Sequence, residues 1–296
     1  MNPEKPSSKA VLSAVVAFGL WGVLPIYWKQ LGHLGSGVAL AQRVVWTMAT
    51  VLPLLMLRGE WSAFLTALRD MRLLKAHAWS AFLLAINWGV FVWAAHHGRI
   101  LDCSIGYFIN PLLNVLIGSR LFGERLSRLQ KLSVAAAASG VLTQLVLVGR
   151  FPWIGLLLAG SFALYGLARR RSPLGSLPGL AVETVVGIPV AAIYLIWAQQ
   201  GSMSIWGTAS AHDLLLIVGL GIITTIPLLG FAYAARQLPF ALLGLLQFLA
   251  PTGHFMVGAF MYHEPINQAS LVSFGLIWLG VLLFCTDLGR RKPATV

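Results

Sequence analysis

Long apolar stretches alternate with short polar segments along the whole chain. A helix that spans a membrane needs about 20 predominantly apolar residues, and ten stretches have the length and composition to form one. The predicted helices are Lys9–Trp28, Val38–Leu57, Lys75–Ala95, Leu101–Phe122, Leu132–Val148, Trp153–Ala168, Pro178–Trp197, Asp213–Ala235, Phe240–Tyr262 and Ala269–Asp287. The longest connection, Arg58–Leu74, is too short for a separate soluble domain. The pattern predicts an all-α integral membrane protein with ten transmembrane helices.

The composition excludes an ordinary soluble domain. Hydrophobic residues make up 58% of the chain and charged residues only 10%, whereas about a quarter of a typical soluble domain is charged. Such a chain has too few polar side chains to cover a globule, but a surface that faces lipid needs none. We therefore expect the lipid bilayer to be the surrounding partner of this protein. The 11 Trp residues agree, because Trp favours the membrane–water interface.

The basic residues predict the orientation in the membrane, because cytoplasmic loops are enriched in Lys and Arg. With the N-terminus inside, Lys29, Arg99 and Arg150 lie outside, Arg43 lies within a helix, and the other 17 of the 21 Lys and Arg residues lie inside. This split predicts that both termini are cytoplasmic, in a bacterial inner (plasma) membrane. Because the basic residues form short loop clusters, the net charge of +12 does not indicate a nucleic-acid partner.

The two halves of the chain, residues 1–149 and 150–296, repeat each other at a constant spacing of 140 residues. The matching pairs are Phe108 and Phe248, Pro111 and Pro251, Gly118 and Gly258, Glu124 and Glu264, Ser133 and Ser273, and Gly140 and Gly280. Each half holds five predicted helices, an odd number, so the second half enters the membrane from the opposite side. Inverted repeats of this kind build many secondary transporters, in which a central site opens to each side in turn.

Six segments carry a family resemblance that covers nearly the whole chain. They are Trp21–Lys29, Asn87–Trp93, Gly106–Val115, Phe122–Arg125, Leu245–Pro251 and Tyr262–Pro265. With them the chain resembles the drug/metabolite transporter superfamily, in its EamA branch and its RarD-like members. The resemblance implies a ten-helix fold of two five-helix halves around a central cavity, and a permease function. His263 departs from the pattern, because it replaces the glycine of the usual Gly-Glu pair.

Arg43 is the most unusual residue in a predicted helix, because an Arg at the centre of a membrane helix costs roughly 2.5–3.5 kcal/mol on insertion scales. One interpretation is a cation in the cavity that meets an anionic group on a small-molecule substrate. The alternative is an Arg whose charge reaches the outer interface or binds the carbonyls at a helix end. The sequence leaves both open.

Other polar and aromatic side chains within the helices complete the candidate substrate site. Asn110 and Asn114 are four residues apart and share a helix face with Tyr107, which suits hydrogen bonding to a solute. The alternative is hydrogen bonding between helices, worth roughly 0.6–2 kcal/mol for each residue in a membrane. The remaining candidates for substrate binding are Asn87, Trp88, Tyr165, Gln247 and His254. A Trp ring supplies a flat wall for an aromatic substrate, whereas a lone His in an apolar helix is more often packed and hydrogen-bonded.

Four prolines within the predicted helices, Pro25, Pro111, Pro227 and Pro251, are candidate hinges. Proline removes a backbone hydrogen bond and kinks a helix, so each marks either a point of bending or a static kink. Pro111 and Pro251 occupy equivalent positions in the two repeats, which favours a role in bending for that pair.

Few acidic residues fall within the helices. Glu183 is the one carboxylate expected inside a helix, where it would either carry a coupling proton or pair with the arginines at 169–171. Glu124 and Glu264 stand at equivalent helix ends, and we expect each to bind the N-terminus of the next helix.

The sequence predicts no catalytic residue, no metal site and no cofactor. Cys103 and Cys285 form no C-x-x-C pair, and His96 and His97 have only Asp102 near them. The favoured function is a secondary transporter of small organic solutes, a drug/metabolite permease for amino-acid-like, organic-acid or chloramphenicol-like compounds. An intramembrane enzyme and a channel-like pore are the alternatives, and monomer and homodimer both stay open.

Overall fold

The computed structural model describes residues 7–97, 99–148, 151–199, 209–263 and 268–290. Within these ranges the chain is helical and contains no β-strand, which confirms the all-α prediction. The elements are α1 (Ser8–Gln30), α2 (Ser36–Leu57), α3 (Trp61–Arg69), α4 (Met71–His96), α5 (Ile100–Leu121), α6 (Arg128–Val148), α7 (Trp153–Arg171), α8 (Ser176–Gln199), α9 (Ala211–Gln237), α10 (Phe240–Gln247), α11 (Leu249–Met256), the π-helical η1 (Val257–Met261) and α12 (Gln268–Arg290).

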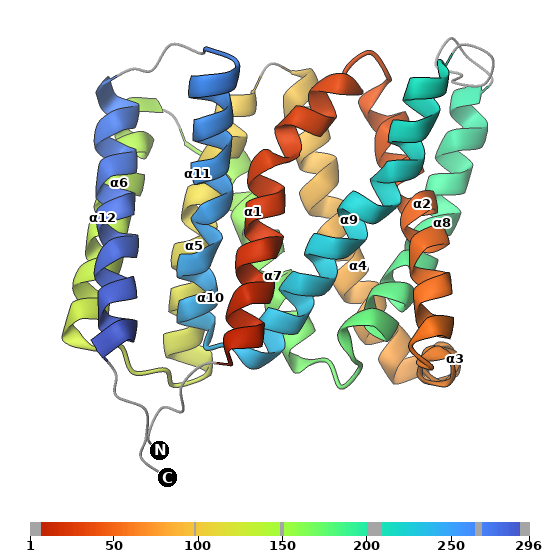
Figure 1. Ribbon diagram of the computed structural model, residues 1–296, viewed down its shortest axis with the longest axis horizontal. Coiled ribbons are helices and arrows are strands. Elements are labelled where there is room, and N and C mark those ends of the chain that lie inside the picture. Colours follow the sequence, from red (N-terminus) through yellow and green to blue (C-terminus); the bar gives the residue numbers. More distant parts are fainter. Residues whose placement is uncertain (1–6, 98, 149–150, 200–208, 264–267, 291–296) are drawn as a thin grey trace.

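In the part of the chain that the structure describes, six stretches of helix are long and apolar enough to cross a membrane, and the count of ten spans stays a prediction. They are Ser8–Gln30, Ser36–Leu57, Met71–Ala94, Ser176–Gln199, Ala211–Gln237 and Phe240–Met261. The long helices lie side by side in one bundle, with the start of α1 and the end of α12 at the same lower edge (Figure 1). The bundle is therefore an integral membrane fold.

The short helix α3 lies at this lower edge, within the connection between the second and third predicted helices (Figure 1). It has nine residues, of which Phe64 and Ala67 are buried. Hydropathy did not predict α3, because one amphipathic helix of this length is far too short to span a membrane.

Large apolar side chains cover the outside of the bundle. Val190 is 72% exposed, Ile193 69% and Leu215 70%. In water such a surface would aggregate, whereas lipid makes it favourable. The interior is filled by aromatic rings, with Phe18, Phe231 and Phe240 fully buried.

Helices α6 and α12 pack against each other along their length at one side of the bundle (Figure 1). A Cβ atom on Gly280 would lie 2.6 Å from the carbonyl oxygen of Ser133, and a Cβ atom on Gly140 would lie 2.6 Å from that of Ser273. Contacts therefore move toward the start of α12 as they move toward the end of α6, so the two helices run antiparallel. Glycine permits the close approach of their backbones.

The predicted helix Phe240–Tyr262 is divided into α10, α11 and η1, with the first break at Phe248. Pro251 has no N–H, so the carbonyl of Gln247 loses the partner it would have in an uninterrupted helix. The equivalent Pro111 lies inside α5, which runs as one helix from Ile100 to Leu121. The two predicted repeats therefore differ in the continuity of the helix at this position.

Candidate functional site

Arg43 lies in the interior of the bundle, where α2 meets α9 and α4. Its side chain is almost fully buried, and its Nε donates a hydrogen bond to Thr224 Oγ1 at 2.8 Å. The guanidinium carbon lies 3.9 Å from the ring centroid of Trp88 and 5.9 Å from that of Trp28. Thr224 stands at the midpoint of the 27-residue α9. The charge is therefore held at a deep position in the membrane and not at a helix end.

Tyr107 and His254 extend this group of side chains. Tyr107 lies near Arg43, and its ring makes an edge-to-face contact with the His254 ring at 5.5 Å. The His254 Nε2 lies 2.9 Å from the carbonyl oxygen of Trp21. Because a carbonyl only accepts hydrogen bonds, Nε2 carries the proton and Nδ1 of the neutral ring is an acceptor. We call Arg43, Thr224, Trp88, Tyr107 and His254 the arginine site.

The predicted amide residues lie close to this site but bond to neighbouring helices. The bonds run from Asn87 Nδ2 to Leu158 O (2.8 Å), from Asn110 Nδ2 to Ala159 O (2.9 Å) and from Asn114 Nδ2 to Gln247 Oε1 (2.8 Å). These bonds fasten α4 and α5 to α7, and α5 to α10. This is the interhelical hydrogen bonding that the sequence left open as an alternative to solute binding.

Tyr165 belongs to a second buried polar group, far along the chain from Arg43. Its hydroxyl donates to Glu183 Oε2 at 3.2 Å, and the other carboxylate oxygen lies 3.3 Å from Arg169 Nη1. Ser80 Oγ donates to the same oxygen at 2.5 Å, and His77 Nδ1 lies 3.4 Å from it. We call these five residues the glutamate cluster.

The glutamate cluster confirms the predicted pairing of Glu183 with one of the arginines at 169–171. It also contains two residues that the sequence reasoning missed, His77 and Ser80. The signal was present, because these two polar residues stand three apart, on one face of a predicted apolar helix.

Glu124 binds a helix N-terminus, as predicted, but that of α10 and not that of the next helix. Its two carboxylate oxygens accept hydrogen bonds from the N–H groups of Phe240 and Ala241 at 2.6 and 2.9 Å. Acidic groups are favourable at that end of a helix. Glu264 lies outside the described residues. Among the candidate hinges, Pro25 lies inside α1 and Pro227 inside α9, and the hinge role of all four prolines stays a prediction.

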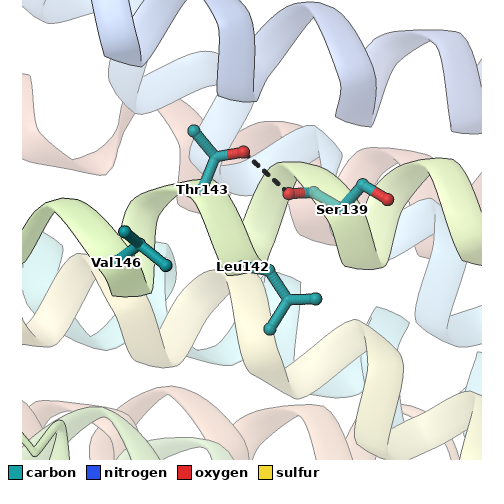
Figure 2. Close-up of a pocket in the computed structure, with 4 residues that line it drawn as sticks. All are labelled: Ser139, Leu142, Thr143 and Val146. Carbon is teal, nitrogen blue, oxygen red and sulfur yellow. Dashed lines mark hydrogen bonds between the residues drawn. The ribbon is translucent and has the colours of Figure 1, made fainter.

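A shallow surface hollow lies away from both polar groups. Figure 2 shows it on the outer face of α6, lined by Ser139, Leu142, Thr143 and Val146. Thr143 Oγ1 donates to the carbonyl of Ser139 at 2.9 Å, so the hydroxyl is satisfied within the helix. Leu142 and Val146 are 58% and 78% exposed. This hollow is an apolar, lipid-facing groove and not a solute site.

No group of three or more His, Cys, Asp or Glu side chains in the described part of the chain is placed to hold a metal ion. The described polar side chains gather instead in the arginine site, the amide bonds around α7 and the glutamate cluster. All three lie between helices of a lipid-exposed bundle, where polar side chains find partners on neighbouring helices.

The chain matches curated proteins over nearly its whole length. It is 38% identical over 292 residues to "Uncharacterized transporter YojE" of Bacillus subtilis, covering 98% of this chain and 97% of that protein. It is 37% identical over 283 residues to "Protein RarD" of Escherichia coli, covering 96% of each. The chain belongs to the RarD family. A further RarD relative, from Pseudomonas aeruginosa, is 32% identical over 97% of this chain and 98% of its own length.

Other comparisons bear on the fold of this RarD-family permease. No protein-family model matches the chain. A solved protein described as "Crystal structure of protein" matches with a TM-score of 0.73 at 22% identity, covering 96% of this chain and 99% of that one. At this identity the likeness shows the fold alone. The relatives, together with the apolar helices, make the chain an integral membrane protein of a transporter family.

Proposed function

We propose that this protein is a secondary carrier of small organic solutes, which binds them at the arginine site and releases them by alternating access. The observation that carries the proposal is a buried cation, Arg43, enclosed by aromatic rings and bonded to α9 from the second half of the chain. An ionisable residue held inside a membrane bundle is expensive, so function is its expected reason for being there.

Two inverted five-helix halves, residues 1–149 and 150–296, would provide the two states. The packing of α6 on α12 supports this, because Ser133, Gly140, Ser273 and Gly280 are two equivalent pairs that meet reciprocally and antiparallel. Equivalent helices pack in this way when a two-fold axis lies in the membrane plane. Each half would then adopt the conformation of the other, which exposes the arginine site first on one side and then on the other.

The names of the relatives support a carrier without identifying the solute. The Pseudomonas aeruginosa relative is named "Chloramphenicol-sensitive protein RarD", which associates that protein with a drug. Amino-acid-like compounds, organic acids and chloramphenicol-like compounds are therefore the first solutes to test. We also propose that both ends of the chain are cytoplasmic. The direction of transport then depends on the side of the membrane from which the solute enters the arginine site.

The test begins with thermal-shift screening of purified protein against amino acids, nucleosides, organic acids and antibiotics. A compound that binds is then followed into proteoliposomes as a radiolabel. A carrier gives saturable uptake. Unlabelled compound on the opposite side of the membrane accelerates this uptake, because the loaded site returns across the membrane faster than the empty site. Non-saturating flux would identify the pore alternative, and a chemically altered product would identify the enzyme alternative.

A further inference from the structure

We propose that the solute carries a carboxylate or another small anionic group, which Arg43 binds, on an apolar or aromatic body. This inference rests on the proposed function and names its substrate class. It follows from what surrounds the two arginines that are buried among the described residues, Arg43 and Arg169, which have very different partners.

Arg169 is a structural cation whose two Nη groups are paired, although its buried Nε makes no hydrogen bond among the described residues. It pairs with Glu183 at 3.3 Å and donates from Nη2 to the carbonyl of Ser176 at 2.9 Å. Removing one partner of a buried ion pair leaves an uncompensated charge in the protein interior. Arg169 therefore serves to balance the charge of Glu183.

Arg43 has no carboxylate partner within the part of the chain that the structure describes. Its Nε is used by Thr224, and one face of its guanidinium is covered by Trp88. The two Nη groups make no hydrogen bond among the described residues. They form the edge of the guanidinium that binds a carboxylate through two parallel hydrogen bonds.

The surroundings of that edge specify the rest of the solute. Trp88 and Trp28 present ring surfaces beside the charge, and Tyr107 lies nearby. Aromatic walls favour a flat or apolar body, and they lower the local dielectric so that the bound charge pair is strong. His254 adds a ring in contact with Tyr107 and, through Nδ1, an acceptor for a hydroxyl or amine of the solute.

The test uses matched pairs of acid and neutral amide on purified full-length protein, with binding measured by thermal shift and by titration calorimetry. The probes are benzoate and benzamide, phenylacetate and phenylacetamide, and indole-3-acetate and indole-3-acetamide. We expect at least one acid to bind and its amide to bind at least about tenfold more weakly, since a hydrogen-bonded charge is worth more than a neutral contact.

The variant Arg43→Gln should lose at least about tenfold of that affinity, and Arg43→Lys should retain part of it. Arg43→Gln should melt at the same or a higher temperature, because it removes an unpaired buried charge. Lys29→Gln is the matched control: Lys29 is an exposed cation beside the Tyr262 ring near the end of α1, and its loss should leave the affinity unchanged.

The inference fails if no acid binds, if acids and amides bind equally, or if Arg43→Gln binds like the native protein. Its failure is distinguishable from failure of the proposed function. If Arg43→Gln still shows saturable, exchange-stimulated transport of neutral compounds, the anionic solute class is rejected and the carrier function is kept. Acid-selective binding at Arg43 without transport of any bound probe would keep the anion-binding site and reject the carrier function.

Discussion

At the scale of single residues, the interior contains polar groups whose hydrogen bonds cross between helices. Glu183 is the strongest case, because it is buried and accepts from Ser80, Tyr165 and Arg169, with His77 beside it. These partners come from α4 and α7, so the carboxylate joins three helices at one point. Low local dielectric makes such a network strong when complete and costly when one member is removed.

Glu183→Gln should therefore destabilise the protein by about 3–5 kcal/mol, because it leaves the fully buried Arg169 without its counter-ion. Unfolding in detergent micelles, followed by circular dichroism against increasing denaturant, measures the change. The same substitution at Glu60, in the turn between α2 and α3, is the control and should cost less than about 1 kcal/mol. A stable Glu183→Gln protein would show that the carboxylate is not the centre of a structural network.

His263 is a second instructive residue. It has a positive φ of 51°, close to the 63° of Gly123, which stands 140 residues earlier at the equivalent position. A left-handed backbone is uncommon for a residue with a side chain, although His tolerates it better than most. The backbone φ angles at these two positions, which the predicted repeat aligns, are therefore similar although the residues differ.

At the scale of helices, backbone contacts through glycine determine which elements approach most closely. Gly280 and Gly140 bring α12 and α6 together, and Gly253 of α11 faces Gly22 of α1, where a Cβ would lie 2.6 Å from the Gly22 Cα. Between lipid-exposed helices there is little hydrophobic driving force, so close packing of small residues supplies the attraction.

Gly280→Ala and Gly140→Ala should each destabilise the protein by about 1–3 kcal/mol, because the new methyl group meets a backbone carbonyl that cannot move aside as a side chain does. Gly275→Ala on the same α12 meets open space, and should be neutral or stabilising by up to about 1 kcal/mol through helix propensity. Thermal melting of the three variants in one detergent compares them. Equal effects at positions 275 and 280 would contradict the close α6–α12 contact.

At the scale of the whole molecule, one edge of the bundle gathers the basic helix ends. Arg58 follows α2, Arg169 and Arg170 close α7, and Arg236 lies in the last turn of α9. α1 starts and α12 ends at this same edge (Figure 1). Because membrane insertion keeps Lys and Arg on the cytoplasmic side, we expect this edge to face the cytoplasm.

Cysteine labelling tests the orientation in a background where Cys103 and Cys285 are replaced by Ala. Ser62→Cys on α3 should resist a membrane-impermeant thiol reagent in intact cells, whereas Gln30→Cys at the far end of α1 should react. Both should react after the cells are opened, which controls for accessibility of the thiols. Labelling of Ser62→Cys from the outside would reject the predicted orientation.

The sequence by itself determined the all-α class, the membrane environment and the RarD-like family, while the ten spans and the two repeated halves stay predictions. These properties are carried by hydropathy, charge and motif, which are read along the chain without knowing any contact. Arg43 was recognised for the same reason, because a charged residue within an apolar stretch can be identified from the sequence alone.

Only the tertiary structure decided which polar groups meet. Arg43 lies against Thr224 and Trp88, while Arg169 lies against Glu183 and His77, across as many as 181 residues of sequence. The asparagines bond to α7 or α10, which no spacing indicated. The reason is that helices in lipid are apolar on their outer and inner faces alike, so periodicity does not say which face turns inward or which helix it meets.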